Sequence, residues 1–305
     1  MIHKLKKHYK DSFLMTDTPV QGDKYNWYVS DEGKLFGIEK AVMTKEEDVL
    51  LSTLFSPFKK NTSSMNEEQR NWYEYLYMNN NSSLSLLSFN NPCRFIQFQT
   101  NEPITDREDF QVAVDALFPY HVVTIWENEY GGTIIESVNG DKNDQVIFEE
   151  IVDTLTSDFY VDIDFFIGQT YTLHLQTPEY FNWERNCFQK SLHYLHKQNV
   201  YRLYEIIPYL LLEKIEPDSA DKLSNAILQD LKHDKEMLQT IKAFIESNLN
   251  VSLAAKKLYM HRNSLQYRID KFIEKTGIDI KHFQGAFTTY LSIINTESFT
   301  TENDR

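Results

Sequence analysis

The stretch from Asn250 to Gly277 constrains the fold most, because two helical patterns meet in it across a short turn. In the first pattern Leu253, Ala254 and Leu258 form an apolar stripe, and Ser252 is the expected N-cap. The second helix should end near Gly277 and has apolar residues spaced i, i+4, i+7 and i+8: Leu265, Ile269, Phe272 and Ile273. The pair predicts a helix-turn-helix, a motif that presents its second helix to the DNA major groove.

The second helix begins with polar residues, and its face away from the core carries Asn263, Tyr267 and Lys271. Four side chains can make bidentate contacts to guanine or adenine edges: Arg262, Asn263, Gln266 and Arg268. Lys256, Lys257 and Lys271 can pair with phosphates. The full predicted DNA-binding set is Ser252, Lys256, Lys257, His261, Arg262, Asn263, Ser264, Gln266, Tyr267, Arg268 and Lys271. The alternative is an ordinary solvated helix face.

The net charge of −14 argues at first against a nucleic-acid partner. Its distribution along the chain reverses that argument. Residues 235–285 contain nine Lys and Arg against five Asp and Glu, a local charge of +4, which leaves −18 on the rest. A basic module on an acidic body concentrates the attraction for DNA on one part of the molecule. Ordinary surface variation is the competing explanation of the +4.

The remaining composition bounds the class of protein. No apolar run approaches the roughly 20 residues of a membrane helix, and the basic N-terminus has no apolar signal-peptide core. Cys93 and Cys187 alone do not form a disulfide framework. We therefore expect a cytoplasmic protein without a membrane partner.

The chain of 305 residues is long enough for several domains, and the predicted fold class is α+β followed by an all-α C-terminal domain. In residues 1–89, an α+β region of unknown role, helices are expected over 46–58 and 67–78, with a hairpin between Tyr25 and Ile38. Residues 79–83 form a polar break, which is either a domain boundary or a loop inside one domain.

The middle region, residues 90–207, alternates strand and helix patterns in the order β-α-β-β-α-β-α-β. That order is typical of ferredoxin-like or nucleotide-cyclase-like α+β domains. Gly131 and Gly132 are expected to form the tight turn of its hairpin, between strands over 121–126 and 133–138. A helical connector (208–234), the helix-turn-helix domain (235–296) and a polar tail (297–305) follow.

The C-terminal third resembles the PucR/CdaR family of bacterial transcription regulators. The resemblance is carried by the string from Leu258 to Arg268, by residues 250–255 before it and by residues 275–279 after it. Weaker similarity covers 90–200, where members of that family often have a degenerate GGDEF-like domain. The resemblance implies a DNA-binding regulator without catalytic activity, because Gly131-Gly132 is followed by Thr133, Ile134 and Ile135 and not by an acid.

Other candidate sites have ordinary structural explanations. Asp162 and Asp164 share one strand face and could hold Mg²⁺ with a nucleotide, although a solvated face is the commoner cause of such a pair. His193 and His196 are spaced for one metal ion but have no third ligand nearby. A set of aromatic residues either lines a ligand pocket or forms core: Trp27, Tyr28, Phe36, Trp72, Tyr73 and Tyr77.

We predict a transcription regulator that binds double-stranded DNA as a homodimer, with no metal, cofactor or catalytic residue. Its N-terminal two-thirds should sense a signal or mediate association, and a small-molecule effector is a further candidate partner. The alternative is a nucleotide-binding or enzymatic α+β protein with a helical docking module.

Overall fold

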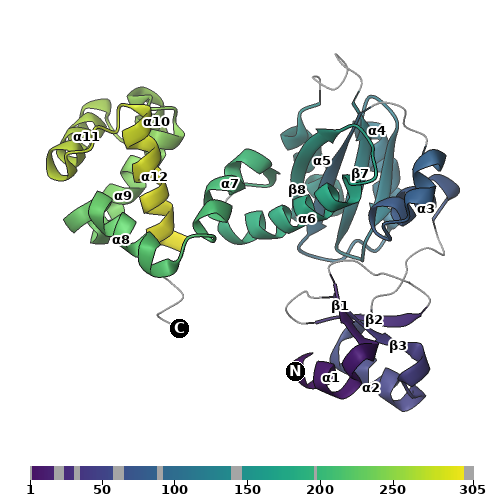
Figure 1. Ribbon diagram of the computed structural model, residues 1–305. Coiled ribbons are helices and arrows are strands. Elements are labelled where there is room, and N and C mark those ends of the chain that lie inside the picture. The colour runs from purple at the N-terminus through teal and green to yellow at the C-terminus, as the bar shows by residue number, and fades with distance from the viewer. Residues whose placement is uncertain are drawn as a thin grey trace. The chain divides into compact units, whose positions relative to one another are not determined.

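The computed structural model describes residues 2–16, 24–30, 35–57, 65–87, 92–138, 146–195 and 198–298. The chain divides into two compact units, residues 1–203 and residues 204–305. Both are seen in Figure 1.

The first unit begins with a small antiparallel sheet in the order β1-β3-β2-β4. Its strands are β1 (Phe13–Met15), β2 (Tyr25–Val29), β3 (Leu35–Glu39) and β4 (Ser56–Pro57). The pairing of β2 with β3 confirms the predicted hairpin, whose turn at 31–34 lies outside the described residues. Helices α1 (Ile2–Tyr9) and α2 (Lys45–Leu54) contribute to a core beside this sheet. Two 3-10 helices, η1 (Lys10–Ser12) and η2 (Lys40–Val42), complete this part.

Helix α2 differs from its predicted range of 46–58. It begins at Lys45 because Thr44 and Glu47 form a capping box that satisfies the free amides of its first turn. It ends at Leu54, and Ser56 and Pro57 are already extended, as expected for a residue that precedes proline.

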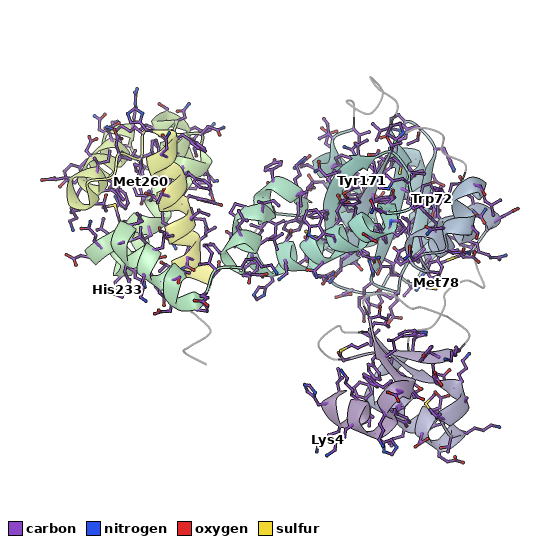
Figure 2. The ribbon with its side chains drawn as sticks, in the orientation of Figure 1. Lys4, Trp72, Met78, Tyr171, His233 and Met260 are labelled. Atoms are coloured by element: carbon purple, nitrogen blue, oxygen red, sulfur yellow. The ribbon has the colours of Figure 1, made fainter. Side chains whose placement is uncertain are left out.

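Helix α3 (Glu67–Leu76) is capped by Asn66 and Gln69 and packs on the second sheet of this unit (Figure 2). The 3-10 helix η3 (Asn81–Leu86) follows it.

The six aromatic residues named as a possible pocket lie in different cores. Tyr28 and Phe36 are buried in the core of the first sheet, whereas Trp72, Tyr73 and Tyr77 are buried against the second. The idea that all six line one pocket is wrong, and the explanation that they form core is confirmed.

The second sheet has the order β6-β7-β5-β8-β9. Its strands are β5 (Cys93–Thr100), β6 (Val122–Trp126), β7 (Gly131–Ser137), β8 (Ile163–Tyr171) and β9 (Val200–Arg202), joined by helices α4 (Arg107–Leu117), α5 (Phe148–Phe159) and α6 (Thr177–Tyr194). The predicted order of elements is confirmed. The first four strands are antiparallel in the ferredoxin-like order, and β9 adds a parallel edge strand to β8.

Both faces of this sheet are covered, which explains why its strands are buried almost throughout. Helices α4 and α5 cover one face over Ile96 and Phe98 of β5. Helices α3 and α6 cover the opposite face over Phe95. Successive residues of β5 thus enter two different cores. The resemblance of this region to a GGDEF-like domain stays a prediction.

The two glycines predicted as the hairpin turn lie instead at the start of β7, and the turn comprises residues 127–130. A β-carbon on Gly131 would collide with the Phe98 carbonyl, and one on Gly132 with the Ile125 carbonyl. The glycines are therefore needed because β5 and β6 approach the backbone closely, a reason that turn statistics do not include.

A buried carboxylate lies at an irregularity of the second sheet. Between Arg94 and Ile96 the register of β5 against β8 shifts, which places Gly168 and Gln169 opposite one residue. Glu184 of α6, which is fully buried, accepts there through Oε1 from the Gln169 amide at 2.7 Å and from the Tyr171 hydroxyl at 2.9 Å. Its Oε2 has no hydrogen-bond partner in the described part of the chain. Burial raises the pKa of Glu184 to about 7.

We expect Glu184→Gln to make the first unit more stable in alkaline solution. Because the folded pKa lies above the ordinary value of 4.5, Glu184 favours folding at acidic pH, and this contribution is lost as pH rises through about 7. The difference between the two pKa values corresponds to a loss of at most about 3 kcal/mol in the free energy of unfolding. The gap between the melting temperatures of variant and wild type should widen as pH rises from 5 to about 7 and change little from there to pH 9. Glu179→Gln, at an exposed position of the same helix, is the control. A constant gap across the whole range would contradict the argument.

The second unit is helical, as the sequence predicts. Its helices are α7 (Leu203–Leu212), α8 (Pro217–Leu228), α9 (Lys235–Glu246), α10 (Val251–Lys257), α11 (Arg262–Thr276) and α12 (Phe283–Ser298), with a 3-10 helix η5 (Gln229–His233). Apolar residues of η5 and of α8 to α12 form one core. Small polar side chains lie between α8 and α12, where Asn295 donates to the Ser224 hydroxyl at 2.9 Å.

Candidate nucleic-acid interface

Helix α10 is capped by Asn250, whose Oδ1 accepts from the Leu253 amide at 3.1 Å. The prediction of Ser252 as the cap is wrong, and Ser252 is an exposed residue of the first turn. Leu253, predicted to be in the apolar stripe, is 51% exposed, and Ala254 and Ala255 are buried instead. With their small side chains, these alanines allow the neighbouring helices to pack closely on α10.

The turn between α10 and α11 is held by two backbone hydrogen bonds. The Met260 amide donates to the Ala255 carbonyl at 2.8 Å, and the Tyr259 amide donates to the Lys256 carbonyl at 3.2 Å. Tyr259 has a left-handed backbone with φ of 53°. This arrangement resembles the helix ending that usually places glycine at the left-handed position.

Helix α11 has a defined start, a buried face and a defined end. The His261 ring caps it by accepting from the Asn263 amide at 3.2 Å. Leu265, Ile269 and Phe272 are fully buried, which confirms the predicted core face. Gly277 ends the helix with φ of 71°, which confirms the predicted stop.

The predicted DNA-binding residues are mostly accessible. Eight are exposed: Ser252, Lys256, Lys257, His261, Arg262, Asn263, Ser264 and Tyr267. Gln266, Arg268 and Lys271 are half-buried. The structure therefore brings the set together on α10, on the turn and on the outer face of α11. Whether each residue contacts DNA stays a prediction.

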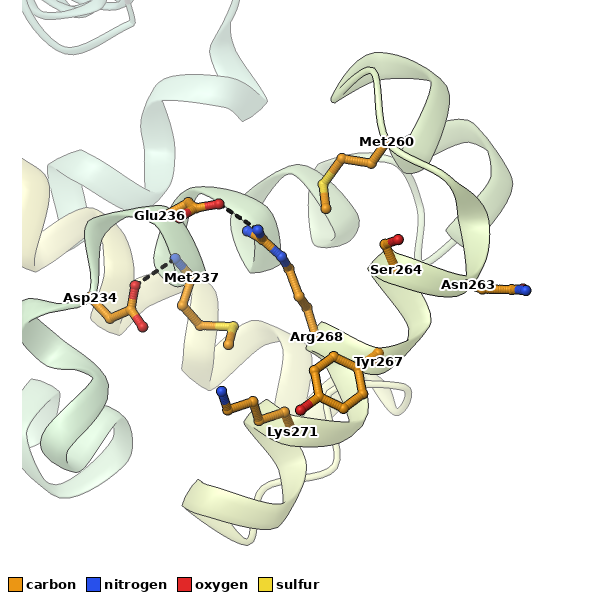
Figure 3. A pocket seen from close by; sticks show the side chains of 9 residues that line it. All are labelled: Asp234, Glu236, Met237, Met260, Asn263, Ser264, Tyr267, Arg268 and Lys271. Atoms are coloured by element: carbon orange, nitrogen blue, oxygen red, sulfur yellow. Dashed lines mark hydrogen bonds and ion pairs between the residues drawn. The ribbon is translucent and has the colours of Figure 1, made fainter.

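A groove of about 750 Å³ runs between the start of α9 and the outer face of α11 (Figure 3). It is lined by Asp234, Glu236, Met237, Met260, Asn263, Ser264, Tyr267, Arg268 and Lys271. In Figure 3 the Asn263 side chain points away from Glu236 and Arg268. The groove contains both acidic and basic groups, and its acids are Asp234, which caps α9, and Glu236 in the first turn of α9.

Arg268 is engaged inside this groove. Its guanidinium forms an ion pair with Glu236 and donates to the Thr240 hydroxyl at 3.0 Å. The predicted role in base recognition would require these contacts to break. In this structure Arg268 instead ties α11 to α9, a role that sequence spacing does not reveal.

Two other predicted residues also have internal partners. Lys257 lies 3.7 Å from the Glu246 carboxylate, and Gln266 donates to Asp270 at 3.0 Å. Asp270 also pairs with Lys281 at 2.8 Å, and this contact lowers the pKa of Asp270. Of the predicted cations, Lys256, Arg262 and Lys271 form no ion pair within the described residues, so these three are available to an anionic partner.

Three comparisons identify relatives of the chain. A family model described as the PucR C-terminal helix-turn-helix domain matches residues 237–294, from α9 into α12. YxkF of Bacillus subtilis, an uncharacterised protein, is 31% identical over 267 residues, which is 87% of this chain and 89% of YxkF. The DNA-binding transcriptional activator AdeR of the same organism is 38% identical over 71 residues, which is 23% of this chain and 17% of AdeR.

The chain belongs to the PucR family of transcription regulators. The proline-responsive transcriptional activator PutR of Bacillus subtilis is 29% identical over 129 residues, 42% of this chain and 30% of PutR. A crystal structure of a regulator of polyketide synthase expression from Bifidobacterium adolescentis aligns with a TM-score of 0.36 at 15% identity, covering 80% of this chain and 97% of that one.

The PucR family is one of regulators and not of enzymes, and the alternative of an enzymatic α+β protein is set aside.

Asp162, one of the two candidate Mg²⁺ ligands, exchanges hydrogen bonds with Asn101. Burial raises the pKa of Asp164 to about 6. No cluster of three metal-binding side chains occurs among the described residues, which include His193 but not His196. In the part of the chain that the structure describes, no helix has both the length and the apolar character that crossing a bilayer requires.

We expect Ile269→Asp to unfold the helix-turn-helix. Ile269 is fully buried, and an unpaired carboxylate there should cost about 3 kcal/mol or more, a large part of a small domain's stability. Hydrogen exchange of the α11 amides in the full-length protein measures this directly. Tyr267→Asp, at a 67% exposed position two residues away, should leave those amides protected. Equal protection in both variants would mean that α11 faces the core differently.

Proposed function

We propose that this PucR-family regulator recognises specific double-stranded DNA through the first turn of α11. The observation that supports this most is the contrast between the buried core face of α11 and its exposed first turn. Leu265, Ile269 and Phe272 are fully buried, whereas the residues from His261 to Ser264 are all exposed at the N-terminal end. In a helix-turn-helix, base contacts come from that end of the second helix.

Roles follow from chemistry and from the contacts already made. Arg262 and Asn263 are the proposed base readers, because both are exposed and can form bidentate hydrogen bonds to guanine and adenine. Lys256 and Lys271 are proposed to contact phosphates, which position the protein without specifying sequence. Ser252, in the first turn of α10, is a further proposed phosphate contact. Arg268 is proposed to act first as the link to α9, because Glu236 and Thr240 already hold it.

Arg262→Ala and Asn263→Ala are expected to weaken binding to a selected operator, each by about 1–3 kcal/mol, because one bidentate contact is lost. Binding to scrambled DNA should change little for Asn263→Ala. The operator is first obtained by selecting genomic fragments that bind the full-length protein, and affinities are then measured at fixed salt. Lys275→Ala is a control, since it removes a charge at the opposite end of α11. Wild-type affinity and an unchanged footprint in both test variants would refute the assignment.

We further propose that the protein acts in the cytoplasm and that residues 1–203 receive a signal or mediate association. PutR, a relative over part of the chain, is named for its response to proline. A small-molecule effector of unspecified chemistry is therefore proposed for this regulator too. The acidic charge outside residues 235–285 would keep that part of the protein away from DNA.

The functional unit is proposed to be a homodimer. A single recognition helix contacts only a few base pairs, and two copies on half-sites about 34 Å apart can form a specific complex. Sedimentation of the full-length protein should show a dimer at micromolar concentration, and the selected operator should contain two related half-sites one helical turn apart. A fragment that begins at residue 204, and so keeps α8 in the core of the second unit, should be a monomer with weak affinity. A full-length monomer that binds one half-site tightly would contradict the proposal.

A further inference from the structure

Tyr259, in the turn between α10 and α11, has a combination of properties that stability does not explain. Its backbone is left-handed, with φ of 53°, a conformation in which a β-carbon is unfavourable and glycine is preferred. Its side chain is 99% exposed and makes no hydrogen bond, ion pair or ring contact within the described residues. Folding therefore gains nothing visible from the tyrosine that would offset the strained backbone.

Other non-glycine residues with positive φ in this unit have local explanations. Leu249, with φ of 59°, packs against the core of the helix-turn-helix. Gln229, with φ of 50°, donates from its side chain to the Thr276 carbonyl at 3.3 Å. Asn248 is of a residue type that tolerates this conformation. Strained backbone without a structural benefit is a reason to look for function.

We propose that the Tyr259 hydroxyl donates a hydrogen bond to a phosphate of the DNA strand that borders the groove occupied by α11. The inference rests on the proposed function and adds a residue to it. Tyr259 comes two residues before His261, which caps α11, and three before Arg262. A helix with its side chains is about 10–12 Å across, and the major groove is about 12 Å wide. With α11 filling the groove, the preceding turn faces the sugar-phosphate strand at its edge.

The chemistry of tyrosine fits this position. Lys256, which forms no ion pair within the described residues, precedes the turn, so the local charge favours an anionic backbone. A phenol is neutral, so its contact releases no counterion and does not depend on salt as a lysine contact does. A phosphate contact also carries no sequence information, so the loss should affect all DNA equally.

The test compares Tyr259→Gly and Tyr259→Phe with the wild-type full-length protein on selected and scrambled DNA. Tyr259→Gly removes the strain, so its melting temperature should equal or exceed that of wild type. Its affinity should nevertheless fall about 3- to 10-fold on both DNAs, the loss expected for one hydrogen bond. Tyr259→Phe keeps the ring and removes the donor, and should lose affinity to the same degree. The slope of log affinity against log salt should not change, whereas Lys256→Ala should reduce it by about 1.

Tyr160 offers a matched control. It is also a left-handed tyrosine at a helix end, with φ of 56° and 91% exposure, but it follows α5 in the other unit. Tyr160→Gly should relieve the same strain and leave DNA affinity unchanged. Wild-type affinity in Tyr259→Gly overturns the inference, as does a loss confined to the selected operator or full affinity in Tyr259→Phe. If Arg262→Ala still weakens binding in that case, only this inference fails, and if neither variant matters the proposed interface fails as well.

Discussion

The burial of one face of α11 is the constraint on which the DNA-binding unit depends. Leu265, Ile269 and Phe272 are fully buried in the shared core, which leaves the helix no freedom to rotate about its axis. Because side chains follow one another every 100° around a helix, fixing one face also fixes the opposite one. The His261 cap and the left-handed Gly277 define the two ends. The exposed side chains are consequently presented from a rigid element, as specific recognition requires.

Electrostatics within the unit reduce the basic charge that is available to DNA. Residues 235–285 carry a net charge of +4, but internal pairing occupies several cations. Arg268 pairs with Glu236, Lys257 with Glu246, and Lys281 with Asp270. The Arg268 pair places an acid beside the outer face of α11, where a nearby phosphate would be repelled. Net charge along the sequence is therefore a poor measure of how strongly one face attracts DNA. That attraction depends on which cations are already held in ion pairs.

The sequence predicted what periodicity controls. The core face of α11 and the order of elements in the second sheet follow from spacings of apolar residues, which reflect burial directly. The end of α11 follows from Gly277, because glycine favours the left-handed position after a helix. The predictions were wrong where the role of a residue depends on a partner that is distant in sequence. Gly131 and Gly132 are needed between strands and not in a turn, and Arg268 pairs with a residue 32 positions earlier. The choice of Asn250 over Ser252 as cap is local, but both residue types cap well, and propensity alone did not separate them.

The two left-handed positions that flank α11 show how stability and function separate along one short segment. At Gly277 the chain uses the residue that suits the conformation, although a β-carbon there would meet no atom within 4 Å. Glycine at this position is thus explained by its preference for the left-handed backbone and not by a lack of space. At Tyr259 the same conformation carries a large, solvent-exposed side chain. Gly277, at the end of α11 away from the proposed contact, has the residue type with the lowest backbone strain. Tyr259, beside the proposed contact, does not. Tyr160 forgoes the same stability after α5 in the other unit, so strain identifies a candidate interface residue only together with its place beside α11.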